Sequence, residues 1–153
     1  MIRVDIPPRG WIELRHAVFD VNGTLALDGE PVPGVVDRLK ALANVLSLHA
    51  LTAGTHGNLA ELEHLLGIPL QVITTGDEKT RYVEQLGPEH VIAFGNGVND
   101  KGMLRIAAIG VAVLGGEGAA ISSLQTADVL VLSPVDAIDL VLKPKRLVAA
   151  LRG

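Results

Sequence analysis

The stretch that decides the fold is Ala17-Val-Phe-Asp20-Val-Asn-Gly-Thr24-Leu25, an apolar run that ends on a carboxylate and passes directly into a glycine-containing loop. This pattern predicts a buried strand with Asp20 at its carboxyl end. The backbone N–H groups of the following loop could hold an anion. Taken alone, the same residues suit an N-cap or an Asx-turn equally well. The rest of the chain has to decide between an anion site and an ordinary turn.

Outward from this stretch, short apolar runs alternate with helical patterns. Besides the strand at 17–20, we expect strands over 45–51, 70–74, 91–94, 109–114 and 128–132. We expect helices over 35–42, 59–66, 76–86 (capped by Gly76-Asp77) and 100–107, with further helical material to the end of the chain. Such alternation predicts a three-layer, doubly wound α/β fold with a parallel sheet. Ligands of such sheets bind at the carboxyl ends of the strands.

Residues 1–15 do not follow this alternation. Apolar runs at 2–6 and 11–14 flank Pro7-Pro8-Arg9-Gly10, which predicts a β-hairpin added to one edge of the sheet. It would cover an edge strand, or Trp11 could make an oligomer contact. We see no linker, so residues 1–153 are expected to form a single domain.

Composition narrows the functional classes. Of the 153 residues 48% are apolar but only 3% aromatic, so the core must be aliphatic. A net charge of −4 gives no reason to bind nucleic acid or an anionic membrane, and Lys143-Pro-Lys-Arg146 suits a solvated helix start better than a nucleic-acid patch. The absence of cysteine excludes thiolate chemistry. No signal peptide opens the chain and its longest apolar stretch, around 106–114, is too short to span a bilayer, so we expect a cytoplasmic protein.

Three more polar groups follow expected strands. Thr52 comes after the run 48–51 and could donate to a phosphate oxygen. Lys79 falls in the first turn of an expected helix, where the macrodipole disfavours a cation. It therefore indicates an anion nearby, unless it is simply a solvated surface lysine. Phe94-Gly-Asn-Gly-Val-Asn-Asp100 gathers oxygen ligands of the kind that a hard divalent cation needs, although a turn with an Asp N-cap explains part of it.

In this order, the four groups resemble the four motifs of the haloacid dehalogenase (HAD) superfamily, over nearly the whole chain. Asp20, Gly23 and Thr24 match the first motif, Thr52 the second, Lys79 the third and, in outline, residues 95–100 the fourth. The second half is most similar to the phosphorylation domain of P-type ATPases and its small soluble relatives. Only 32 positions separate Asp20 from Thr52, and 27 separate Thr52 from Lys79, which leaves no room for a nucleotide-binding domain or a cap.

The resemblance implies a phosphatase mechanism. Asp20 would attack phosphorus and become an aspartyl phosphate. The implied phosphate-binding residues are Val21, Gly23, Thr24, Thr52, Ala53 and Lys79. Mg²⁺ would be held by Asp20, the backbone carbonyl of Asn22, Asn96 and Asp100. The substrate would be a phosphorylated small molecule or macromolecule, and a second subunit of a homo-oligomer could close the open site.

Two positions depart from the family pattern. Asn22 stands where phosphatases carry the aspartate that protonates the leaving group, and an amide cannot exchange a proton. General acid–base catalysis typically contributes about 10²–10⁴-fold, so slow turnover is expected. P-type ATPases also lack this acid. Asn96 replaces an acidic Mg²⁺ ligand, so Mg²⁺ affinity should fall unless Asp100 enters the coordination sphere. His56 could act as a substitute acid–base group.

One alternative remains open, and the sequence argues against two others. The chain could be a phosphoacceptor or interaction module with little turnover. A bacterial receiver domain also uses Asp, Thr and Lys at strand ends, but it needs an acidic pair before the phosphoacceptor, and Glu13 lies too far from Asp20. Nucleotide binding at 110–118 is disfavoured because Gly115-Gly116-Glu-Gly118 does not match Gly-x-Gly-x-x-Gly.

Overall fold

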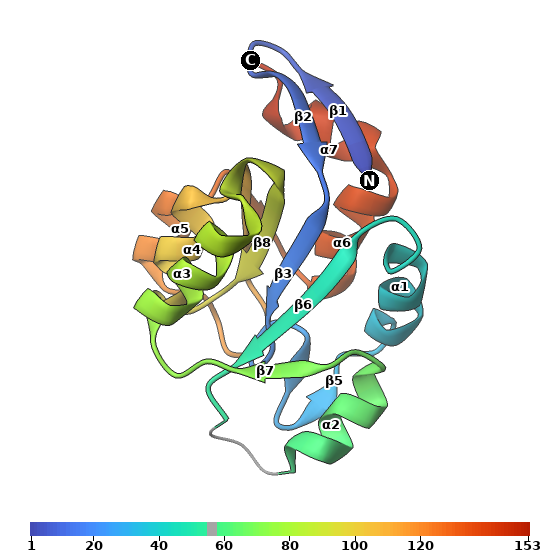
Figure 1. Cartoon of the computed structure of the whole chain (residues 1–153), viewed down its shortest axis with the longest axis vertical. Coiled ribbons are helices and arrows are strands. Elements are labelled where there is room, and N and C mark those ends of the chain that lie inside the picture. The colour runs from blue at the N-terminus through green and yellow to red at the C-terminus, as the bar shows by residue number, and fades with distance from the viewer. Residues whose placement is uncertain (55–57) are drawn as a thin grey trace.

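The computed structural model describes residues 1–54 and 58–153, and a six-stranded parallel sheet lies at its centre (Figure 1). The strand order is β10-β9-β8-β3-β6-β7. The bounds are β3 (His16–Asp20), β6 (Ser47–Thr52), β7 (Leu70–Val72), β8 (Val91–Gly95), β9 (Ile109–Val113) and β10 (Val129–Val131). Strand order reverses beside β3, which lies between β6 and β8. The predicted doubly wound sheet is therefore confirmed, and Asp20 ends the strand at its switch point.

Helices cover both faces of the sheet, which makes the three predicted layers (Figure 1). On one side lie α1 (Val35–Leu42), α2 (Leu59–Leu66), α6 (Pro134–Leu142) and α7 (Pro144–Leu151). On the other lie α3 (Gly76–Leu86), α4 (Lys101–Ile106) and α5 (Ile121–Thr126). Two 3₁₀ turns, η1 (Pro88–His90) and η2 (Val98–Asp100), precede β8 and α4.

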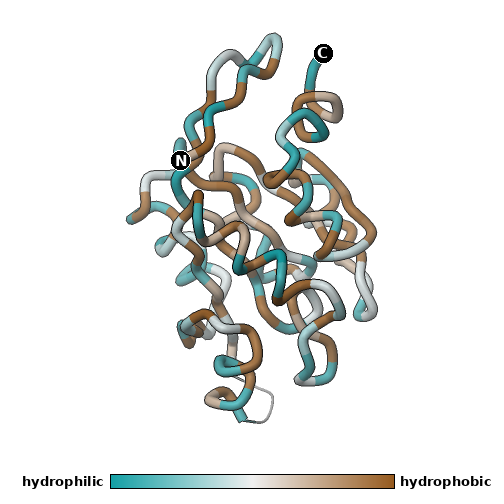
Figure 2. The backbone as a smooth tube through the Cα atoms, turned by 90° about the vertical axis from the view of Figure 1, so that its right-hand side faces the viewer, coloured by the Kyte–Doolittle hydropathy of each residue, from teal (hydrophilic) through white to brown (hydrophobic). Residues whose placement is uncertain are grey.

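Burial on both faces explains why the strands read as continuous apolar runs. In β3, Ala17 and Phe19 belong to the larger hydrophobic core, whereas Val18 faces the smaller core under α3 and α4. Phe19 stacks on Phe94 of β8, with ring centroids 4.5 Å apart and ring planes at 9°. Figure 2 shows the brown, hydrophobic segments running through the middle of the molecule. These contacts fix β3 against β8, and so fix the two loops that follow them.

Several element boundaries match the sequence expectation, while others shift for local reasons. The helices at 35–42 and 59–66 have the expected bounds. The cap of α3 is Thr75, whose hydroxyl accepts from the backbone N–H of Glu78, rather than the expected Gly76-Asp77. The expected strand over 70–74 ends at Val72. The short helix α5 was not expected.

The N-terminal hairpin is confirmed, but its expected place on a sheet edge is wrong. β1 (Ile2–Ile6) and β2 (Gly10–Leu14) pair only with each other, and β2 leads into the central strand β3. The reason lies at Arg15, whose N–H donates to His90 O at 2.9 Å while its carbonyl accepts from Ser47 N at 2.9 Å. The chain therefore enters the sheet between β6 and β8. Trp11 stays 67% exposed, beneath the Arg3 guanidinium.

The segments that could carry a cap are short. Between Asp20 and Thr52 lie the small hairpin of β4 (Ala26–Leu27) and β5 (Glu30–Pro31) and the helix α1. Between Thr52 and Lys79 the described residues form only α2, β7 and the start of α3. This agrees with the expected absence of a cap. Within residues 1–54 and 58–153, no helix is long and apolar enough to cross a membrane.

A chain of titratable side chains links β3, β6 and α3. His16 Nδ1 lies 3.1 Å from His49 Nε2, and His49 Nδ1 lies 2.8 Å from the Tyr82 hydroxyl. Burial, together with the neighbouring His16, lowers the pKa of His49 to about 4. Burial also lowers the pKa of His16, with help from His90 and Arg15. Both imidazoles are therefore neutral in the folded protein at pH 7.

We predict that this pair makes the protein less stable in mild acid. Because the folded pKa of His49 lies below its unfolded value, its contribution is complete above about pH 6.5 and is lost as the pH falls toward 4. His49 is partly exposed, so we expect a loss of only about 1 kcal/mol in unfolding free energy between pH 7 and 5. Urea unfolding at both pH values measures it. His49→Gln should reduce the loss and exposed His64→Gln should keep it; an equal loss in His49→Gln would contradict the prediction.

Candidate active site

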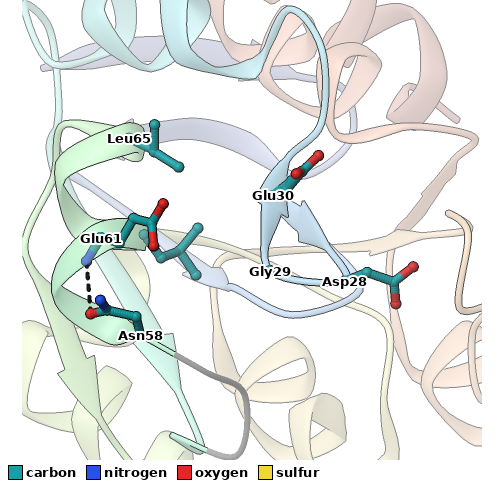
Figure 3. Close-up of a pocket in the computed structure, with 7 residues that line it drawn as sticks. Asp28, Gly29, Glu30, Asn58, Glu61 and Leu65 are labelled. Carbon is teal, nitrogen blue, oxygen red and sulfur yellow. Dashed lines mark hydrogen bonds between the residues drawn. The ribbon is translucent and has the colours of Figure 1, made fainter.

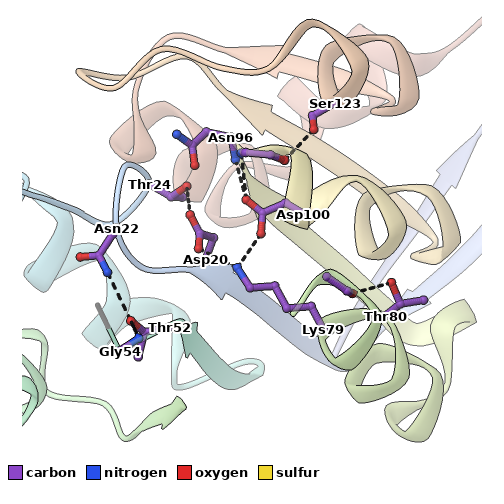
Figure 4. Close-up of polar contacts among 12 residues, drawn as sticks. Asp20, Asn22, Thr24, Thr52, Gly54, Lys79, Thr80, Asn96, Asp100 and Ser123 are labelled. Carbon is purple, nitrogen blue, oxygen red and sulfur yellow. Dashed lines mark hydrogen bonds and ion pairs between the residues drawn. The ribbon is translucent and has the colours of Figure 1, made fainter. Parts of the chain in front are cut away.

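Lys79 joins two carboxylates at the carboxyl edge of the sheet (Figure 4). Its Nζ lies 2.8 Å from Asp20 Oδ1 and 2.7 Å from Asp100 Oδ1. Asp20 ends β3, Lys79 lies in the first turn of α3, and Asp100 lies where η2 meets α4. Lys79 and Asp100 are fully buried. The structure thus brings together three residues that are 21 and 59 positions apart along the chain.

Asp100 is held by the backbone of its own turn. Its Oδ2 accepts from the N–H groups of Asn96 and Gly97, both at 3.0 Å. Glycine is needed at position 95, because a Cβ there would lie 2.5 Å from Asp100 Cγ. Both oxygens of Asp100 are therefore engaged, one by Lys79 and one by the backbone. This arrangement makes Asp100 an anchor for Lys79, and its expected role as a metal ligand stays a prediction.

Asp20, Lys79 and Asp100 form a charged triad, in which burial and neighbouring charges shift the pKa values in different directions. Burial and the neighbouring Asp100 raise the pKa of Asp20 to about 7, although Lys79 and Thr24 oppose the rise. Burial works to lower the pKa of Lys79, but Asp20 and Asp100 together raise it above its usual value. Lys79 therefore stays cationic, and two carboxylates share its one charge. A further cation near Asp20 would relieve the excess negative charge and favour the ionised nucleophile.

The loop after Asp20 is tightly bonded to itself. The Thr24 hydroxyl donates to Asp20 Oδ2 at 3.2 Å. The backbone N–H groups of Val21, Gly23 and Thr24 donate to carbonyl oxygens of Leu51, Ala26 and Val21, respectively. An incoming anion would compete with these carbonyls for the N–H groups. Their expected role in phosphate binding therefore remains a prediction.

Thr52 is prepared to donate a hydrogen bond. Its Oγ1 accepts from Asn22 Nδ2 and from Gly54 N, both at 3.2 Å (Figure 4). Because both acceptor positions of the hydroxyl are used, its own proton is left for another acceptor. Thr52 is fully buried, and the neighbouring Ala53 is partly buried. Asn22 Oδ1 is buried without a partner in the described part of the chain.

Asn96 offers a neutral oxygen beside Asp20. Its Nδ2 donates to Gly118 O at 3.1 Å, and Figure 4 shows its oxygen on the side of Thr24 and Asp20. Among the residues that the structure describes, no three His, Asp or Glu side chains are grouped to hold a metal. A carboxylate and a carboxamide are nevertheless hard oxygen donors, which suit a divalent cation that keeps several waters. The residues present therefore fit such a cation.

Sequence reasoning missed two residues of this region. The buried Ser123 of α5 donates to Gly97 O at 2.7 Å and so fixes the Asn96–Asp100 turn. Glu117 of the turn after β9 lies against Gly23. The sequence signal that could have pointed to Glu117 is the glycine-rich stretch around it, which follows an expected strand. The expected acid–base substitute His56 lies outside the described residues.

A separate cavity of 510 Å³ lies between the β4–β5 hairpin and α2 (Figure 3). Its lining includes the carboxylates of Asp28, Glu30 and Glu61. None of its lining residues belongs to the triad or contacts it by a hydrogen bond. Among the residues that the structure describes, this cavity is therefore separate from Asp20, Lys79 and Asp100.

Comparison with known proteins agrees with this geometry. The family model of haloacid dehalogenase-like hydrolases matches residues 70–127. An uncharacterized protein of Methanocaldococcus jannaschii is 38% identical over 78 residues, which cover 48% of this chain and 84% of that protein. The chain belongs to the haloacid dehalogenase superfamily.

Solved structures show the same fold. A 3-deoxy-D-manno-octulosonate 8-phosphate phosphatase from Moraxella catarrhalis, solved with magnesium and phosphate, matches with a TM-score of 0.65 at 18% identity, over 85% of this chain and 86% of that one. The catalytic domain of the CPx-ATPase CopB matches with a TM-score of 0.56 at 26% identity, over 81% of this chain and 46% of that one. The expected likeness to both HAD phosphatases and P-type ATPases is confirmed.

We predict that removing either side of the Lys79–Asp20 pair changes stability in opposite directions. Lys79→Met leaves two buried carboxylates without a counter-charge and should lower the unfolding free energy by about 3 kcal/mol. Asp20→Asn should raise it by about 1 kcal/mol at pH 8, because an Asp whose folded pKa is raised loses its contribution as the pH rises through that value.

Chemical denaturation in EDTA measures both changes. The exposed Lys145→Met is the matched control and should stay within about 0.5 kcal/mol of the unmodified protein. If both variants are destabilised, or if both are neutral, the excess negative charge that we assign to the triad is contradicted.

Proposed function

We propose that the protein is a Mg²⁺-dependent phosphatase that acts through an aspartyl phosphate on Asp20. The observation that carries the proposal is the buried contact of Lys79 with Asp20 and Asp100 at the switch point of the sheet. A carboxylate and a buried ammonium group meet there, and the Thr52 hydroxyl ends the neighbouring strand β6. These are the groups that phosphoryl transfer requires.

Each residue has a distinct part in the reaction. A carboxylate oxygen of Asp20 attacks phosphorus in line, and the ester P–O bond breaks as the new O–P bond forms. Lys79 and the Thr52 hydroxyl stabilise the phosphoryl oxygens. The leaving oxygen takes its proton from water, because Asn22 has none to give. Water then attacks the same phosphorus, which releases inorganic phosphate and restores Asp20.

The oxygen donors around Asp20 are proposed to hold Mg²⁺. Asp20, the backbone carbonyl of Asn22 and Asn96 would provide the ligands from the protein. Asp100 would join them through Oδ1, which accepts only from Lys79 in the described part of the chain, because Oδ2 already accepts two backbone N–H groups. When bound, the ion supplies charge neutralisation and alignment of the phosphoryl group.

Asn22 favours slow turnover, and it also supports a second candidate function. A chain that is readily phosphorylated but slowly hydrolysed would act as a phosphoacceptor or interaction module. The open site would admit a phosphorylated small molecule or macromolecule, and a second subunit could close it. We propose the cytoplasm as its location.

Hydrolysis of p-nitrophenyl phosphate with Mg²⁺ tests the leading proposal. We expect slow, saturable release of p-nitrophenol that Asp20→Ala abolishes, since Asp20 is the group proposed to form the covalent intermediate. EDTA should abolish it too, and added Mg²⁺ should restore it. Activity that survives Asp20→Ala unchanged would end the phosphatase proposal.

Asn22→Asp separates the two candidate functions. The new carboxyl group can protonate a leaving group, so hydrolysis of alkyl phosphates should rise about tenfold or more, and that of p-nitrophenyl phosphate less. The Asn22 amide donates to the Thr52 hydroxyl, whereas an ionised aspartate at position 22 would accept the hydroxyl proton of Thr52. That proton would then no longer be available to the substrate, so KM should rise together with kcat. Asn22→Ala is the control and should raise only KM. Fast alkyl phosphate hydrolysis by the unmodified protein would rule out the phosphoacceptor alternative.

A further inference from the structure

Glu117 is an acidic side chain beside the site that the proposed reaction does not use. It lies in the turn 115–118 that follows β9, where Gly118 N donates to Gly115 O at 3.0 Å. Like the nucleophile loop, this turn lies at the carboxyl edge of the sheet. Its side chain is exposed to solvent.

The carboxylate of Glu117 occupies the space above Gly23. A Cβ built on Gly23 would lie 2.4 Å from Glu117 Oε2 and 2.6 Å from Asn96 Nδ2. The Glu117 carboxylate and the Asn96 carboxamide therefore lie side by side, over the loop that follows Asp20. Any side chain at position 23 would displace one of them.

The backbone of the turn is tied to the same asparagine. Asn96 Nδ2 donates to Gly118 O at 3.1 Å, and Ala120 N donates to Asn96 O at 2.8 Å. Gly115 packs on the nucleophile loop, since a Cβ there would lie 3.3 Å from Gly23 O. Position 117 is thus held at the site by contacts on both sides of the turn.

The side from which Glu117 approaches indicates its role. The chain lacks two expected acids, at positions 22 and 96. The Asn22 side chain turns toward Thr52 and β6, whereas Glu117 arrives from β9 and lies next to Asn96. Glu117 therefore lies on the side of Asn96, where the family pattern has an acidic metal ligand, and not on the side of Asn22.

Charge balance supports this assignment. Asp20 and Asp100 share the single positive charge of Lys79, so a further carboxylate at this edge of the sheet adds to the excess negative charge. Ionised, the three carboxylates and the lysine carry two net negative charges, which is the charge that one divalent cation neutralises.

We propose that Glu117 is the second acidic group of the divalent-cation site and acts on the cation through its bound water. The inference rests on the proposed function, because that function places a cation beside Asp20. It assigns a role to the glycine-rich stretch 115–118, which the family resemblance left without one.

Calorimetric titration of the full chain with Mg²⁺ tests the proposal without relying on catalysis. Loss of a group that acts through bound water typically costs metal affinity about 10–100-fold, and we expect a loss in this range for Glu117→Gln. The Mg²⁺ affinity of Glu117→Asp should lie between those of the unmodified protein and of Glu117→Gln, since aspartate keeps the charge but has a shorter side chain. Glu89→Gln removes the same charge from the opposite edge of the sheet and should bind as the unmodified protein does.

A double variant makes the test specific to position 96. If Glu117 compensates for Asn96, then Asn96→Asp should restore the affinity that Glu117→Gln loses. Unchanged Mg²⁺ affinity in Glu117→Gln would overturn the inference while leaving the proposed function intact. Absence of Mg²⁺ binding by the unmodified protein would instead overturn the cation in the proposed function, and the inference with it.

Discussion

The contact of the buried Lys79 ammonium with Asp20 and Asp100 is the interaction on which the rest of the structure depends. A charge without solvent is tolerated only when it is paired and hydrogen-bonded, and here the pairing draws on three separate elements. β3, α3 and the turn before α4 must all reach their places before any one of these charges is compensated. The stacked Phe19 and Phe94, in the core on the sheet face opposite α3, hold β3 against β8. The cost of the triad is an Asp20 carboxyl group whose pKa is raised to about 7, and a cation bound beside Asp20 would offset that cost.

The amides at positions 22 and 96 change the charge of that site and its capacity for proton transfer, while the contacts of Lys79 with Asp20 and Asp100 are kept. Asn22 gives up proton transfer but orients Thr52, whose hydroxyl is left with its proton to donate. Asn96 carries no charge but keeps a neutral oxygen, and its Nδ2 anchors the turn that carries Glu117. The proposed reaction therefore keeps nucleophilic attack and charge stabilisation, and it loses the proton transfer that would speed turnover.

Much of the fold could be predicted because it depends on local patterns. The run at 17–20 and its counterparts are apolar on both faces, which identifies parallel strands, and the helices at 35–42 and 59–66 follow from their spacing alone. The hairpin was misplaced because its position depends on the backbone pairing of Arg15 with two strands distant in sequence. Asp100 was expected at the metal, but only the folded turn shows that both of its oxygens are engaged. Glu117 could not be found from spacing, since its place over Gly23 depends on how two loops pack.

A crystal structure with Mg²⁺ and beryllofluoride tests the central claim most directly. Beryllofluoride mimics a phosphoryl group on a carboxylate. We predict that it will be bonded to Asp20, with Lys79 and Thr52 donating to its fluorides and Mg²⁺ beside Asn96. Beryllofluoride bound elsewhere, or a structure in which Lys79 lies apart from Asp20, would contradict the account.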